Sequence, residues 1–97
     1  MKTTAEYITQ IRQYKDANAE RLGIKRIGIF GSVSRGEQKE NSDLDVFVEL
    51  RNPQYYIMCE IKDNLEAICQ CTVDLVRLRS SLRPLLLKRI EEDGITA

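Results

Sequence analysis

The chain has 97 residues, of which 42% are hydrophobic and 31% are charged. Fifteen basic and fifteen acidic residues cancel to a formal net charge of zero, so no strong overall field favours nucleic-acid or membrane binding. The absence of histidine excludes a Ser-His-Asp triad and a histidine-ligated zinc site within this chain. This length predicts one domain, residues 1–97, with a single modest core.

No apolar run approaches the ~20 residues that a transmembrane helix needs, and residues 1–7 lack the apolar stretch of a signal peptide. The three cysteines form no CxxC pattern, which favours reduced thiols over a disulfide framework. We therefore expect a cytoplasmic protein that does not associate with membranes.

The first expected element is a helix that begins after Thr3. Thr3 and Glu6 have the spacing of a capping box, and Gly23 is a suitable stop. Apolar residues between them recur at helical spacing, which predicts a stripe packed in the core. Its members are Tyr7, Ile8, Ile11, Tyr14 and Leu22.

Residues 24–30 form an apolar run that predicts the first strand. Gly28 lies inside it, and a glycine in a strand marks close approach of another group, here a packed helix or a bound ligand. Gly31 and Ser32 end the run and open a short helical turn that reaches Gly36. Such a turn exposes backbone N–H groups, and the start of a helix favours anions.

Residues 44–50 predict the second strand, whose even-numbered positions are apolar and face the core. Asp43 and Asp45 then share the other side, roughly 7 Å apart along the backbone. Strands are depleted in aspartate, so two at alternate positions indicate a function such as holding Mg²⁺. The structural alternatives are a loop cap for Asp43 and a solvent-facing strand position for Asp45.

The next helix is expected to start with Asn52 as cap and Pro53 in the first position, and to reach about Gln70. Residues 72–77 predict the third strand, which carries Asp74 near its start. Ser80 or Ser81 is then expected to cap a last helix that has Pro84 in its first turn and ends at about Asp93, before Gly94.

If the glycine turn and the three aspartates lie at one site, the directions of the strands follow. Gly31 and Ser32 end the first strand while Asp43 and Asp45 open the second, so the two strands are expected to be antiparallel neighbours. Asp74 joins them only if the third strand runs parallel to the second, which requires a crossover such as the helix over 53–70. We therefore predict an α+β fold in the order α-β-α-β-α-β-α, with a small mixed sheet, helices mainly on one face and the acidic site toward the other.

Gly31-Ser32, ten residues and then Asp43-x-Asp45 resembles the signature of the nucleotidyltransferase superfamily related to DNA polymerase beta. The fuller blocks are similar to those of the minimal nucleotidyltransferases, or MNT domains, often encoded beside a HEPN-domain protein as its antitoxin. These blocks are residues 31–36 (GSVSRG), 42–45 (SDLD), 73–76 (VDLV) and 82–85 (LRPL). The resemblance implies a fold like the palm of DNA polymerase beta.

The resemblance also implies the reaction, which is transfer of AMP from ATP to an acceptor hydroxyl, in this setting a tyrosine of the HEPN toxin, with release of pyrophosphate. Two Mg²⁺ ions, or alternatively Mn²⁺, would clamp the displacement. Asp43, Asp45 and Asp74 would be the metal ligands and catalytic residues. Gly31 and Ser32 would hold nucleotide phosphates. Arg35 has two open roles, which are pairing with the triphosphate and bracing the loop against Glu37.

Three further stretches have alternative interpretations. Tyr55 and Tyr56 either stack on a nucleobase or pack within their helix, and packing is the favoured interpretation. The basic run from Arg77 to Arg89 is either a solvated helix face or a partner contact. Leu85 to Leu87 form either a wide core stripe or an interface. Oligomerisation stays open.

Two rival functions remain. One is an antitoxin that neutralises its toxin by covering it, without catalysis. The other is a catalytic subunit that modifies a small molecule together with a partner helical chain.

Overall fold

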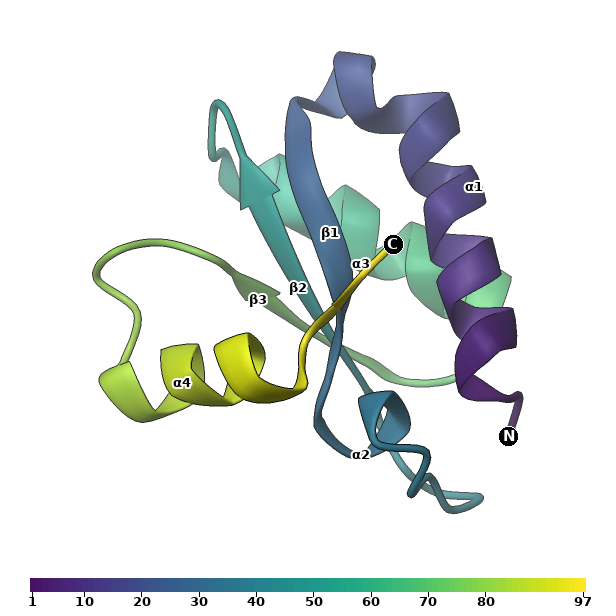
Figure 1. The fold of residues 1–97 in the computed structure, drawn as a ribbon. Coiled ribbons are helices and arrows are strands. Elements are labelled where there is room, and N and C mark those ends of the chain that lie inside the picture. Colours follow the sequence, from purple (N-terminus) through teal and green to yellow (C-terminus); the bar gives the residue numbers. More distant parts are fainter.

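The computed structural model describes residues 1–97, which form four helices and four strands (Figure 1). The α+β organisation agrees with the prediction, except that a short strand follows the last helix. In chain order the elements are α1 (Thr4–Leu22), β1 (Ile24–Phe30), α2 (Gly31–Ser34), β2 (Leu44–Leu50), α3 (Tyr55–Cys69), β3 (Val73–Arg77), α4 (Pro84–Asp93) and β4 (Ile95–Thr96).

The ends of α1 follow from local sequence. The Thr3 hydroxyl accepts a hydrogen bond from the Glu6 backbone N–H at 3.1 Å, and the Glu6 carboxylate accepts one from the Thr3 N–H at 3.0 Å. This reciprocal pair is the predicted capping box. Gly23 ends the helix in the left-handed conformation, with a φ of 71°, which glycine adopts without strain.

The four strands form one mixed sheet in the order β3-β2-β1-β4. β1 is antiparallel to β2, β2 is parallel to β3, and β4 is antiparallel to β1. Helix α3 makes the crossover between the parallel strands β2 and β3 (Figure 1). The predicted antiparallel and parallel pairings are therefore confirmed.

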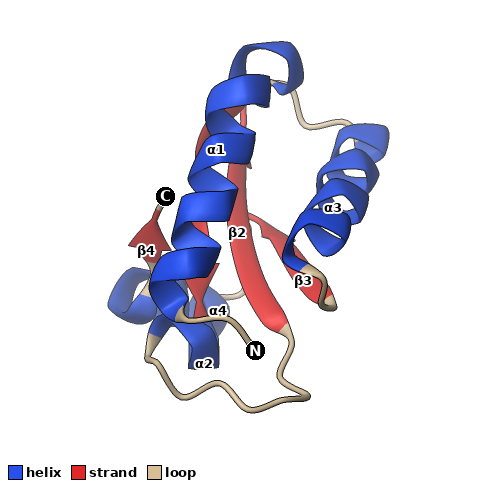
Figure 2. Cartoon of the chain, turned by 90° about the vertical axis from the view of Figure 1, so that its right-hand side faces the viewer, coloured by secondary structure: helices blue, strands red, loops and turns tan.

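Successive side chains of strand β2 point alternately to the two faces of the sheet. Its even-numbered residues, Leu44 to Leu50, lie in the larger core with α1 and α3. Phe47 points the other way, into a smaller cluster with Phe30, Leu82 and Ile90. Figure 2 shows the result, with α1 and α3 on one side of the sheet and α4 on the other. The prediction that helices pack mainly on one face is confirmed.

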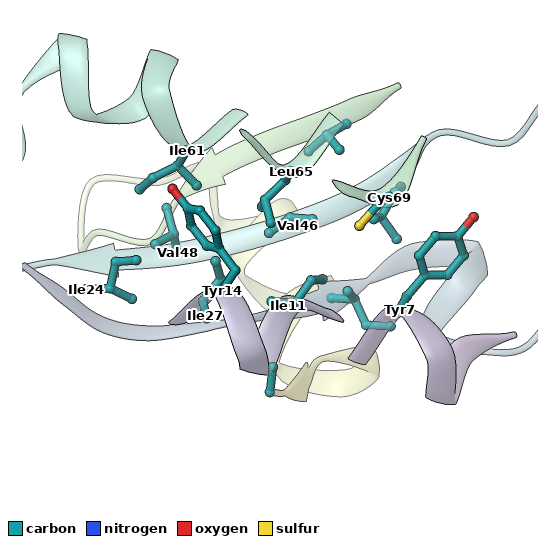
Figure 3. Close-up of a cluster of buried hydrophobic side chains, with 14 of the residues drawn as sticks. Tyr7, Ile11, Tyr14, Ile24, Ile27, Val46, Val48, Ile61, Leu65 and Cys69 are labelled. Atoms are coloured by element: carbon teal, nitrogen blue, oxygen red, sulfur yellow. The ribbon is translucent and has the colours of Figure 1, made fainter. Parts of the chain in front are cut away.

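The larger core lies where α1 and α3 cover β1 and β2 (Figure 3). Ile11, Ile27 and Ile61 have no exposed surface, and each buried side chain of this size contributes roughly 1.5–3 kcal/mol of stability. The hydroxyl of Tyr14 accepts a hydrogen bond from the Asn64 side chain at 3.0 Å, so its polar end has a partner. No helix combines the length and the apolar composition needed to cross a bilayer.

Two helix starts differ from the prediction. Helix α3 begins at Tyr55 rather than Pro53, because the carbonyl of Gln54 is the one that accepts the first hydrogen bonds, from Ile57 and Met58. Helix α4 begins at Pro84, without capping by Ser80 or Ser81. The residue before a proline is pushed out of the helical conformation, which explains why Arg83 stays outside the helix.

The predicted packing of Tyr55 and Tyr56 is wrong. Their side chains are 84% and 67% exposed, because the buried face of α3 passes through Ile57, Ile61 and Leu65 instead. For the three leucines of α4, the sequence left open a core stripe or an interface, and the structure divides them. Leu86 and Leu87 pack against the smaller cluster, whereas Leu85 is 65% exposed.

Gly28 is required for close packing, and the groups that pack against it are strand β4 and the ring of Phe47 rather than a helix. It pairs with Thr96 of β4, and a methyl group there would overlap the Ile95 carbonyl oxygen and lie 2.6 Å from the Phe47 ring. The glycine therefore allows β4 to join the sheet.

Replacing Gly28 with alanine is expected to reduce the free energy of unfolding by about 1–3 kcal/mol, because the added methyl has no space. Strand β4 should loosen first, so the amide of Ala97, which donates to the Ile27 carbonyl at 2.9 Å, should lose protection in hydrogen exchange. Gly36→Ala is the control for protection of β4, because a methyl group there meets no atom within 4 Å and the cost of its left-handed φ of 72° falls on the loop after α2. It should leave Ala97 protected. Unchanged stability and protection in Gly28→Ala would contradict the packing interpretation.

Candidate functional site

A pocket of about 710 Å³ opens where the C-terminal end of β1 meets the N-terminal ends of β2 and β3. Five of the six residues that the sequence predicts for the site line it, and α4 closes the opposite wall. The five are Gly31, Ser32, Arg35, Asp45 and Asp74. The fold therefore brings together groups that lie 43 positions apart along the chain, between Gly31 and Asp74.

Asp45 and Asp74 are direct partners in the parallel pairing of β2 with β3. Neighbouring strands are about 4.8 Å apart, and paired residues point to the same face, so the two carboxyl groups are held side by side. The pKa of Asp45 is raised from 3.8 to about 6, mainly by burial and then by the charges of Asp74 and Asp43. The Arg35 guanidinium acts in the opposite direction without cancelling it.

Gly31 has to be glycine for two reasons. Its φ is 75°, in the left-handed region that other residues rarely adopt, and a β-carbon there would overlap a carboxylate oxygen of Asp45. The pairing of Phe30 with Asp45 across β1 and β2 produces this contact. The glycine turn and the acidic pair are therefore adjacent parts of one site.

Ser32 stands in the first turn of α2, and its hydroxyl forms no hydrogen bond within the chain, whereas the Ser34 hydroxyl donates to the Gly31 carbonyl at 2.7 Å. The residue at the N-cap position is Phe30, which gives no side-chain cap. The first backbone N–H groups of a helix have no partner inside the helix. The turn thus offers donors beside the carboxylates.

Asp43 is the sequence-predicted residue that the structure sets apart. It precedes β2, its side chain is exposed, and it does not line the pocket, although its charge contributes to the raised pKa of Asp45. No group of three or more acidic, cysteine or histidine side chains is arranged to hold a metal ion. Two of the three predicted carboxylates therefore meet, and the third stands at the edge.

Arg35 is engaged with two carboxylates. Its guanidinium donates to Glu37 at 3.2 Å and to Asp93 of α4 at 2.8 Å. The bracing interaction with Glu37 is therefore present, and the link to Asp93 ties α2 to α4. Because Arg35 also lines the pocket, its role toward a phosphate stays a prediction.

The wall formed by α4 contains residues that the sequence analysis did not assign to the site. Arg83, immediately before the helix, and Arg89 within it both line the pocket, and neither forms an ion pair. Leu86 lies between them on the same wall. Residues 83, 86 and 89 follow one another at a spacing of three, which is the signal that could have grouped both arginines with Leu86.

The pocket has an acidic side and a basic side. The carboxylates of Asp45 and Asp74 lie on the sheet, and the pKa of Asp45 is raised. Arg83 and Arg89, which form no ion pair, line the opposite wall. Carboxylate oxygens are the ligands that Mg²⁺ prefers, and such an ion usually bridges to a substrate phosphate. Arginine is suited to phosphate recognition. The residues present therefore fit a divalent cation with a polyphosphate.

Comparison with known proteins agrees with this chemistry. The family model of the nucleotidyltransferase domain matches residues 11–96. Protein adenylyltransferase MntA of Thermococcus cleftensis is 37% identical over 91 residues, which cover 93% of this chain and 91% of that protein. The protein MJ0128 of Methanocaldococcus jannaschii is 40% identical over 96 residues, which cover 98% of each chain.

A solved structure of a toxin–antitoxin complex with AMP-PNP contains a chain that superposes on this one with a TM-score of 0.75. The two are 28% identical, and the match covers 91% of this chain and 69% of that chain. The chain described here therefore belongs to the nucleotidyltransferase domain family and is a nucleotidyltransferase of the protein adenylyltransferase type.

Proposed function

We propose that this protein transfers AMP from ATP to a tyrosine hydroxyl of a HEPN-domain toxin, in a reaction that depends on Mg²⁺, and so acts as the antitoxin of that toxin. The observation that carries the proposal is the Asp45–Asp74 pair facing Arg83 and Arg89 across one pocket. The names of the relatives support it, since one is the protein adenylyltransferase MntA and one is part of a toxin–antitoxin complex with AMP-PNP.

The acidic side of the pocket would hold the cation. Asp45 and Asp74 would be its inner ligands, and Asp43 would join them from the edge of the site. Bound Mg²⁺, with Mn²⁺ as an alternative, supplies charge neutralisation for the triphosphate and for the displaced pyrophosphate. Asp74, which is exposed, would also receive the proton of an incoming hydroxyl.

The opposite side would hold the triphosphate. The backbone N–H groups of Gly31 and Ser32 would donate to phosphate oxygens, together with the Ser32 hydroxyl. Arg83 and Arg89 would bind the phosphates that leave, because guanidinium groups match phosphate geometry. The acceptor oxygen then attacks the α-phosphorus, the bond from that phosphorus to the bridging oxygen breaks, and pyrophosphate departs.

Transfer is expected to fail when the acidic pair of the sequence motif is neutralised. Asp43→Asn with Asp45→Asn should reduce labelled AMP transfer from ATP to the purified HEPN partner by at least about 100-fold, because charge stabilisation of the displacement is lost. Mass spectrometry of the partner should place the wild-type adduct on a tyrosine. Asp63→Asn, an exposed residue of α3 outside the pocket, is the matched control.

Growth of cells that express the toxin separates catalysis from steric neutralisation. If the double variant transfers no AMP but still rescues growth, covering the toxin is its mode of action and the proposal is wrong. If an adduct forms only on a small molecule, the acceptor assignment is wrong.

The acidic pair should also destabilise the fold in the absence of cations. The folded pKa of Asp45 is about 6, above its unfolded value, so the folded state loses stability as the pH rises from about 4 to about 6. Asp45→Asn should therefore raise the free energy of unfolding by about 1–3 kcal/mol at pH 7 in EDTA, and by almost nothing at pH 4.

Thermal denaturation in EDTA at the two pH values measures this effect. Addition of Mg²⁺ at pH 7 should raise the Tm of the wild type more than that of Asp45→Asn, since only the former keeps the full ligand set. Equal responses to Mg²⁺ would contradict the assignment of Asp45 as a ligand.

A further inference from the structure

A second hollow, of about 670 Å³, lies along the outer edge of β3. It is lined by α3 on one side of the sheet, by β3 itself, and by the segment that leads into α4 on the other side. Its apolar floor includes Met58 of α3, Leu75 and Val76 of β3, and Leu82 and Leu86. We call this hollow the edge groove.

The edge groove is continuous with the candidate nucleotide pocket. Val76, Arg83 and Leu86 line both hollows. A chain lying in the edge groove would thus reach the carboxylate pair without crossing any other part of the surface. This continuity gives the groove a role in bringing an acceptor to the pocket.

The rim of the edge groove is exclusively basic. Lys62, Arg77, Arg79 and Arg83 line it, and no acidic residue does. Lys62 pairs with Glu66 at 3.4 Å, but none of the three arginines forms an ion pair. The whole chain has zero net charge, so the excess of positive charge in the groove is local and does not reflect the overall composition. It is complementary to an acidic ligand.

The shape of the edge groove favours a polypeptide over a nucleic acid. Strand β3 is the last strand of the sheet, and its outer edge has no strand partner. An extended peptide can add to such an edge through main-chain hydrogen bonds. Tyr55 at the groove wall is 84% exposed, and an exposed aromatic side chain is a typical anchor for a protein partner.

We propose that the edge groove binds an extended, acidic segment of the protein acceptor and presents its hydroxyl group to the pocket. This inference rests on the proposed function, because it assigns the acceptor site of the same reaction. The bond changes are those given above, in which the acceptor oxygen replaces pyrophosphate on the α-phosphorus and its proton passes to a carboxylate.

Two synthetic peptides provide the test. Each is extended, ten residues long and contains one tyrosine, and they differ only in whether glutamate or lysine fills the flanking positions. Fluorescence anisotropy without ATP measures peptide binding, and labelled ATP with Mg²⁺ measures transfer. The wild type should bind the glutamate peptide at least 10-fold more tightly, and this preference should weaken as salt is added.

The variant Arg77→Glu with Arg79→Glu should lose this preference and favour the lysine peptide instead. Neither residue lines the nucleotide pocket, so binding of a fluorescent ATP analogue with Mg²⁺ should stay unchanged. Arg12→Glu with Arg51→Glu makes the same change in charge at exposed positions outside both hollows and should behave as the wild type. Thermal denaturation checks that all variants fold.

The outcomes separate the two proposals. Charge-dependent binding of the glutamate peptide, with no transfer to the purified HEPN partner, supports the edge groove and contradicts the proposed function. Transfer with no difference between the peptides, or with no effect of the arginine variant, overturns the edge groove alone. Displacement of the glutamate peptide by a labelled oligoribonucleotide through the same arginines, or self-association that the arginine variant abolishes, also overturns it.

Discussion

The structure depends on two like charges being held side by side. Asp45 and Asp74 occupy paired positions on parallel strands, so the backbone hydrogen bonds of the sheet fix the two carboxyl groups against their repulsion. Such an arrangement reduces stability unless a cation or a proton compensates the charge. The hydrophobic core on the opposite face of β2, in which Val46 and Val48 are completely buried, supplies the stability that tolerates it. The site is thus strained electrostatically and supported by packing.

The pocket has two walls of different origin. The acidic wall comes from the sheet, whose register is set by core packing. The basic wall comes from α4, which meets the sheet through the smaller cluster around Phe47 and Ile90. The ion pair between Arg35 and Asp93 connects the turn after β1 to this helix. The width of the pocket therefore depends on the position of α4 relative to the sheet.

Much of the sheet could be predicted from the sequence, because alternation in β2 and the position of each aspartate leave one consistent arrangement of three strands. The same reasoning did not place Asp43, since this residue precedes the strand and alternation does not govern its direction. Strand β4 is only two residues long, too short for any periodic signal. Its contact with Gly28 is long-range, so the sequence could show that the glycine was needed but not which group approaches it.

Arg83 and Arg89 were recognised as part of a basic run but were not assigned to the pocket, for a related reason. A basic residue on a helix is usually solvated, and only the tertiary position of α4 shows that Arg83 and Arg89 face the carboxylates. Tyr55 illustrates the opposite error, because an aromatic residue near a helix start was expected to be buried. It lies two residues before Ile57, about half a helical turn, and so on the side of α3 away from the buried stripe.

The open margin of the sheet has a consequence for how the molecule behaves at high concentration. Unpaired strand edges invite indiscriminate pairing between molecules, and charged side chains are a common protection against it. On β3 that protection comes from Asp74 and Arg77, which flank the apolar Leu75 and Val76. Asp74, to which the proposed function gives a catalytic role, thus also protects this edge against aggregation. A descendant that lost the activity would still need a charge at this position to remain dispersed.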